Sequence, residues 1–126
     1  MIYQTAHKVN VARQVRNYLS LSRLSFDVVD IETLPKGALP PFDITFALAV
    51  EGHIVDKERF YQLLGDVTQR RLYFEANGGA DLLLIKRMLA AQGFSHIEER
   101  GVSSDDRDPR NHNRHLLIAR KELSDE

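Results

Sequence analysis

Hydrophobic and polar positions alternate in two different periods along this chain, which predicts helices and strands in alternation. Apolar residues at the i, i+3, i+4 spacing of an amphipathic helix recur in three stretches, which are residues 7–21, the segment opened by Asp56, and 81–92. Short stretches rich in β-branched and aromatic residues predict strands at 25–32, 42–50, 70–76, 96–103 and 115–120.

The longest apolar run covers residues 42–50 and is interrupted only by Asp43 and Thr45. A run of that length between turn signals is typical of a strand that is covered on both faces. We therefore expect this strand to be the most buried one.

The order of these elements predicts an α/β fold. Repeated strand–helix units favour a mostly parallel sheet with helices on both faces. The last two strands are joined by a polar loop of about ten residues, which is too short for a helical crossover. We expect this C-terminal pair to be antiparallel.

Composition narrows the class of protein. A length of 126 residues predicts a single domain over 1–126. Lys and Arg number 17 and Asp and Glu 18, so nucleic-acid binding is not favoured. The chain has no cysteine, and neither a membrane-spanning run nor a signal peptide is visible. We expect a soluble, cytoplasmic protein without membrane contact.

Several local motifs follow one another in an order that resembles the class I, Rossmann-like S-adenosylmethionine-dependent methyltransferases. They are Val-Asp-Ile-Glu-Thr-Leu-Pro at 29–35, Phe-Asp-Ile-Thr followed by an apolar run and His-Ile at 42–54, the strand and Asn-Gly-Gly exit at 71–79, Gly-Phe at 93–94, and the closing strand at 115–121. The resemblance covers about residues 8–121 and implies S-adenosylmethionine as cofactor.

One segment of that pattern is missing. The family's first strand ends in a glycine-rich turn, whereas none of the seven glycines here precedes Gly37. The chain therefore resembles the C-terminal two-thirds of the methyltransferase fold. Three explanations stay open: the chain is a fragment, a partner chain or second copy covers the exposed sheet edges, or residues 1–6 form a substitute strand.

The resemblance implies a set of cofactor-binding residues at the ends of two strands. Asp30 would accept a hydrogen bond from the adenine amino group, with the Ile31 backbone nearby, and Leu48 and Ala49 would line the pocket near the methionine part. The alternatives are that Asp30 forms a turn and that Leu48 and Ala49 are plain sheet core.

Catalytic and substrate-binding candidates follow the ends of the strands at 42–50 and 70–76. His53 has the side chain best suited to proton transfer near neutral pH, and Glu51 could orient it or bind a substrate amine. Asn77 could line the mouth for a small-molecule substrate. The alternatives are a structural histidine at a helix start and a plain strand-to-helix turn.

A metal site is not predicted. The acidic and histidine residues of the C-terminal loop match neither a calcium loop nor a zinc helix, and arginines are interleaved among them; these residues are Asp105, Asp106, Asp108, His112 and His115.

Two functions remain open from the sequence. The first is a methyltransferase, or the C-terminal part of one, with an unknown methyl acceptor and no activity of the isolated chain without the missing segment. The alternative is a non-catalytic, methyltransferase-like scaffold or dimerisation module that does not bind the cofactor.

Overall fold

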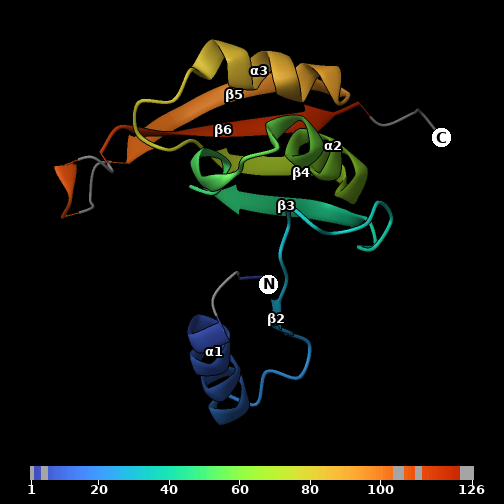
Figure 1. The fold of residues 1–126 in the computed structure, drawn as a ribbon, viewed down its shortest axis with the longest axis vertical. Coiled ribbons are helices and arrows are strands. Elements are labelled where there is room, and N and C mark those ends of the chain that lie inside the picture. Colours follow the sequence, from blue (N-terminus) through green and yellow to red (C-terminus); the bar gives the residue numbers. More distant parts are fainter. Residues whose placement is uncertain (1, 4–5, 104–106, 110–111, 123–126) are drawn as a thin grey trace. The chain divides into compact units, whose positions relative to one another are not determined.

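The computed structural model describes residues 2–3, 6–103, 107–109 and 112–122. It contains two compact units, Met1–Pro35 and Lys36–Glu126. Each unit has its own sheet (Figure 1). That the two units form a single domain stays a prediction.

The first unit consists of one helix and two very short strands. Strand β1 (Ile2–Tyr3) pairs in parallel with β2 (Asp27–Val28), and α1 (Ala6–Tyr18) connects them. One of the three open explanations was a substitute strand from residues 1–6; a strand is present at Ile2–Tyr3, but it pairs with β2 and is not part of the sheet that contains β3. Met1, Gln4 and Thr5 lie outside the described residues.

Both elements of this unit end earlier than the hydrophobic pattern predicted. Helix α1 ends at Tyr18 because Ser20 adopts a left-handed conformation with φ 56°. Strand β2 covers two residues of the expected eight. The Phe26 carbonyl accepts from the Arg13 guanidinium at 2.7 Å, and the Asp30 carboxylate accepts from the Glu32 N–H at 3.0 Å. Because these groups on either side of β2 bond elsewhere, the backbone there does not continue the strand.

The second unit is a four-stranded mixed sheet with the order β3-β4-β6-β5. Strands β3 (Phe42–Leu48) and β4 (Thr68–Glu75) are parallel, and β6 (Arg114–Lys121) runs antiparallel to both β4 and β5 (Phe94–Ser103). The α/β class and the antiparallel C-terminal pair are confirmed.

Two helices join these strands, and the sequence predicted both of them. Helix α2 (Lys57–Val67) begins after Asp56, whose carboxylate accepts from the Arg59 N–H, and α3 (Leu82–Ala91) begins after Asp81 in the same way. Helix α3 ends before Gly93, which adopts φ 95°. The two helices contact each other and lie on the same face of the sheet (Figure 1).

The core of this unit lies between those helices and one face of the sheet. Tyr61 of α2 stacks on Phe74 of β4 with ring centroids 6.1 Å apart. The almost fully buried apolar side chains here include Phe60, Tyr61, Leu64, Leu72, Phe74, Ile85, Leu89, Phe94, Leu117 and Ala119. Their burial on a single face follows from the two-residue period of the strands.

Strand β3 differs from the expectation of burial on both faces. Ala47 is buried, but Phe42, Ile44, Phe46 and Leu48 are between 45% and 65% exposed. The physical reason is position: β3 is the outer strand of its sheet, and only its Ala47 side faces the helices. An apolar run does not by itself reveal where a strand lies in the sheet order.

Candidate functional site

The candidate site lies where the parallel strands β3 and β4 end. Leu48 and Glu75 form the last residue pair of the two strands, so β3 and β4 end side by side. Open α/β sheets bind ligands outside the carboxyl ends of their strands. This end is therefore where ligand-binding groups are expected.

Ala49 makes a sharp turn directly after β3. Its N–H donates to the Glu75 carbonyl at 2.9 Å, and its backbone adopts φ 55°, a conformation that residues other than glycine seldom take. Such strained residues persist only where neighbouring groups hold them. The chain then forms the short 3-10 helix η1 (Glu51–His53) before α2 begins.

The neighbouring group that holds this turn is the Asn77 side chain. Its Nδ2 donates to the Ala49 carbonyl at 3.2 Å, and its Oδ1 accepts from the Gly52 N–H at 2.7 Å. A Cβ on Gly52 would lie 2.7 Å from Asn77 Cγ, so the contact needs glycine. Asn77 thus ties the exit of β4 to the exit of β3.

Glu51 is buried although it is charged. It is 8% exposed, and Lys57 Nζ lies 3.1 Å from its Oε1 and also donates to its backbone carbonyl at 2.8 Å. A buried carboxylate is tolerated when it is paired and hydrogen-bonded in this way. The pairing with Lys57 was not expected from the sequence.

Tyr61 of α2 interacts with the same carboxylate. Burial, and then the negative charge of Glu51, raises the pKa of the Tyr61 hydroxyl well above its usual range. The hydroxyl interacts with the Glu51 carboxylate, but it has no well-formed hydrogen bond to any of the described residues. We therefore regard the contact as mainly electrostatic.

The remaining predicted site residues, His53, Asp30 and Ile31, are divided between the two units. His53 is exposed, and its backbone N–H donates to Val50 O at 3.0 Å. Asp30 and Ile31 lie in the first unit, where Asp30 forms the turn that the sequence allowed as its alternative role. The structure thus brings Ala49, Glu51 and Asn77 together at one strand end.

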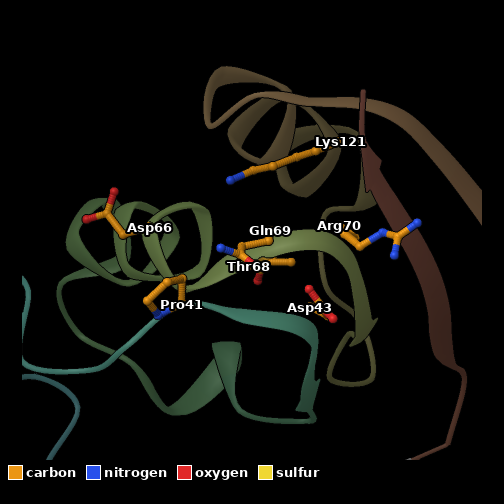
Figure 2. Close-up of a pocket in the computed structure, with 7 residues that line it drawn as sticks. All are labelled: Pro41, Asp43, Asp66, Thr68, Gln69, Arg70 and Lys121. Atoms are coloured by element: carbon orange, nitrogen blue, oxygen red, sulfur yellow. The ribbon is translucent and has the colours of Figure 1, made fainter. Parts of the chain in front are cut away.

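The opposite end of the strands carries an open pocket of about 550 Å³ (Figure 2). Its lining mixes charges of both signs, from Asp43, Asp66, Arg70 and Lys121. Burial lowers the pKa of Lys121, whose ammonium donates to the Gly65 carbonyl and lies 5.3 Å from the Phe94 ring centroid. Lys121 is therefore used to hold α2 on the sheet.

No group of metal-ligating side chains occurs within the residues that the structure describes. Asp105 and Asp106 of the C-terminal loop lie outside them. In the same part of the chain, no helix is long and apolar enough to cross a membrane.

Solved structures share this arrangement of elements. The N-terminal domain of EvdMO1 with SAH bound has a TM-score of 0.80 at 13% identity, over 96% of this chain and 63% of that chain. Magnesium protoporphyrin IX methyltransferase (ChlM) from Synechocystis PCC 6803 with bound SAM has a TM-score of 0.72 at 16% identity, over 96% of this chain and 58% of that chain. The fold is that of the class I methyltransferases.

The methyltransferase fold is present here in part. This chain spans 30% of the longer EvdMO1 structure and less than two-thirds of its N-terminal domain. The fold also carries other chemistry, since the [4+2]-cyclase SpnF matches with a TM-score of 0.70 at 16% identity, over 98% of this chain and 65% of that chain. No protein-family model and no curated protein matches the sequence.

Proposed function

We propose that this chain forms the methyl-donor side of an S-adenosylmethionine-dependent methyltransferase. The observation that carries the proposal is the match of 96% of the chain to a domain whose structure contains SAH. The parallel strand ends at Leu48 and Glu75 support it, because they form the kind of sheet edge at which α/β folds bind ligands.

The residues at this edge suggest how the donor would be held. Leu48 is 52% exposed and offers an apolar side chain to a ligand. The backbone turns sharply at the next residue, Ala49. We assign these two residues to the methionine part of the cofactor. Asp30 and Ile31 belong to the first unit, and the contact with the adenine ring that the sequence resemblance implies for them stays a prediction.

A small-molecule methyl acceptor is proposed to bind beside the η1 turn. Methyl transfer is a displacement in which the protein mainly positions the two reactants. His53, which is exposed, is the group we propose for accepting a proton from the acceptor. Glu51 is paired with Lys57, which favours a role in orienting the acceptor over proton transfer. Asn77 holds the η1 turn that carries Glu51 and His53.

The isolated chain is expected to bind S-adenosylmethionine without catalysing methyl transfer. The glycine turn that would approach the cofactor in this fold has no counterpart before Gly37. Methyl transfer is therefore proposed for a protein in which a glycine-bearing strand completes the sheet. We expect that protein to act in the cytoplasm.

Calorimetric titration of the full chain with S-adenosylhomocysteine tests the proposal. We expect a dissociation constant in the micromolar range, and a Leu48→Lys variant that binds about tenfold more weakly, a loss of 1.4 kcal/mol. Phe42→Lys is the matched control, because Phe42 is 45% exposed on the same face of the same strand but lies at its other end. Absence of binding to the folded chain would contradict the proposal.

A second candidate function is a non-catalytic scaffold with the same fold. The sequence keeps it open, because no glycine-rich turn that could approach the cofactor precedes Gly37 and the fold alone does not determine the function. A folded chain that binds neither S-adenosylmethionine nor S-adenosylhomocysteine would support the scaffold.

A further inference from the structure

The pocket at the amino ends of β3 and β4 is a second concave site, at the opposite end of these strands from the candidate site (Figure 2). All the residues that line it belong to the second unit. Its volume of about 550 Å³ lies in the range of pockets that hold small molecules. The proposed methyl-donor binding leaves this pocket without a role.

A shift in strand register shapes one wall of the pocket. The register of β3 on β4 shifts between Phe42 and Ile44. At the shift, Gln69 and Arg70 of β4 together face the single residue Asp43. Bulges of this kind redirect side chains and are over-represented next to active sites. The bulge here places an acidic and a basic side chain of neighbouring strands at the same pocket.

The charged side chains around the pocket balance in number, but they are not paired with one another. The acidic ones, Asp43 and Asp66, come from β3 and α2, and the basic ones, Arg70 and Lys121, come from β4 and β6. With the residues that the structure describes, Asp43, Asp66 and Arg70 form no ion pair. Their charges are therefore available to a ligand.

Lys121 is only partly committed to the fold. Its ammonium donates to the Gly65 carbonyl near the end of α2 and lies 5.3 Å from the Phe94 ring centroid. Asp66 attracts this ammonium without forming an ion pair with it. A lysine ammonium has three N–H groups, so two of them remain for a ligand in the pocket.

We propose that this pocket binds a small polar zwitterion of the amino-acid class. The carboxylate of the ligand interacts with Arg70 and Lys121, and its ammonium interacts with Asp43 and Asp66. Figure 2 shows the exposed Arg70 guanidinium pointing outward, so this side chain turns toward the ligand on binding. A zwitterion carries no net charge, which matches a pocket whose four charges also cancel.

Other classes of ligand fit this lining less well. A simple anion would meet the carboxylates of Asp43 and Asp66, and a metal cation would meet Arg70 and Lys121. A nucleobase would need an aromatic side chain to stack on, and none of the lining residues is aromatic. The Thr68 hydroxyl already donates to the Thr45 hydroxyl at 2.9 Å, so the charged groups carry the recognition.

Titration of the isotopically labelled full chain with L-glutamine, followed by NMR, tests the proposal. We expect the amide signals of Asp66, Gln69 and Arg70 to shift, with a dissociation constant of about 1 mM. N-acetyl-L-glutamine lacks the ammonium and L-glutaminamide lacks the carboxylate, so each should bind about tenfold more weakly. Equal binding of all three compounds, or no shifts with L-glutamine, would overturn the proposal.

Single substitutions test the two kinds of charge separately. Asp43→Asn and Arg70→Gln should each weaken L-glutamine binding about fivefold or more, because each removes one charge partner of the ligand. Arg87→Gln is the matched control, since Arg87 is exposed on α3 and does not line the pocket. Lys121 stays unchanged in these variants because it also holds α2. Unchanged binding in both pocket variants, or the same loss in Arg87→Gln, would leave an ordinary charged surface and overturn the site.

This site does not rest on the proposed donor binding. S-adenosylhomocysteine also has an amino-acid end, so the amide signals that shift decide between the two sites. Donor binding is expected to shift Leu48 and Ala49 and to weaken in Leu48→Lys. Binding in the pocket is expected to shift Asp66 and Gln69 and to weaken in Arg70→Gln. Each proposal can therefore fail while the other holds.

Discussion

At the scale of single residues, Asn77 has the clearest role in the second unit. It bonds to backbone on both sides of the η1 turn and supports the left-handed Ala49. Its position after β4 suggested a contact with substrate, which stays a prediction. The geometry adds a positioning role, because any ligand at Leu48 meets a backbone that Asn77 holds in place.

We predict that Asn77→Ala lowers the free energy of unfolding by about 1–3 kcal/mol, because two backbone groups lose their partner. Urea unfolding followed by circular dichroism measures the change. Gln62→Ala is the control: Gln62 is exposed on α2, and its substitution should change stability by less than about 0.5 kcal/mol. Equal losses in both variants would contradict the role of Asn77.

The raised pKa of Tyr61 predicts a loss of stability in alkaline solution. The unfolded chain ionises this hydroxyl near pH 10, whereas the folded chain keeps it protonated, so stability falls as the pH rises above that value. Tyr61→Phe should remove up to about 1.4 kcal/mol of this loss per pH unit. The exposed Tyr18 provides the control, since Tyr18→Phe should leave the pH dependence unchanged. Urea unfolding between pH 8 and 11.5 tests both variants.

At the scale of elements, helices were more predictable than strands. Helices α2 and α3 carry their start signals locally, at Asp56 and Asp81, and both carboxylates cap as expected. Strand β2 is short because Arg13, which belongs to α1, takes the Phe26 carbonyl. Such a bond between distant residues leaves no trace in the local pattern.

In the candidate site, the position of the strand ends was predictable, and the side-chain contacts were not. The strand ends at Leu48 and Glu75 follow from the alternation of elements, because turns bound each strand. The pairing of Glu51 with Lys57 depends on the 3-10 helix η1, which begins at Glu51. The burial of Tyr61 next to Glu51 depends on how α2 packs on the sheet. These contacts arise only when the elements come together.

We predict that the cap of α3 contributes measurably to stability. Asp81→Ala should lower the free energy of unfolding by about 1 kcal/mol, because the Leu84 N–H loses its acceptor. Asp81→Asn should lose much less, since asparagine caps helices about as well as aspartate. Urea unfolding of the two variants measures the difference, and equal losses would assign the effect to the negative charge near the helix start.

At the scale of the whole molecule, the two units differ in how much apolar surface they bury. Among the described residues, Val9 and Phe26 are the buried apolar side chains of the first unit, and all the others lie in the second. Hydrophobic burial supplies most of the free energy that opposes unfolding. The first unit therefore has a much smaller source of stability.

We predict that the first unit opens without the second. Amide hydrogens in the middle of α1 should exchange through an opening at least about 2 kcal/mol lower in free energy than those of the central strand β6, because local openings span the range from zero to global unfolding. Native-state hydrogen exchange, followed by NMR in low concentrations of urea, measures both. In α1 the exchange should depend weakly on urea, since little surface is exposed when a small unit opens. Equal free energies and equal urea dependence in α1 and β6 would show one cooperative unit, as the single-domain prediction requires.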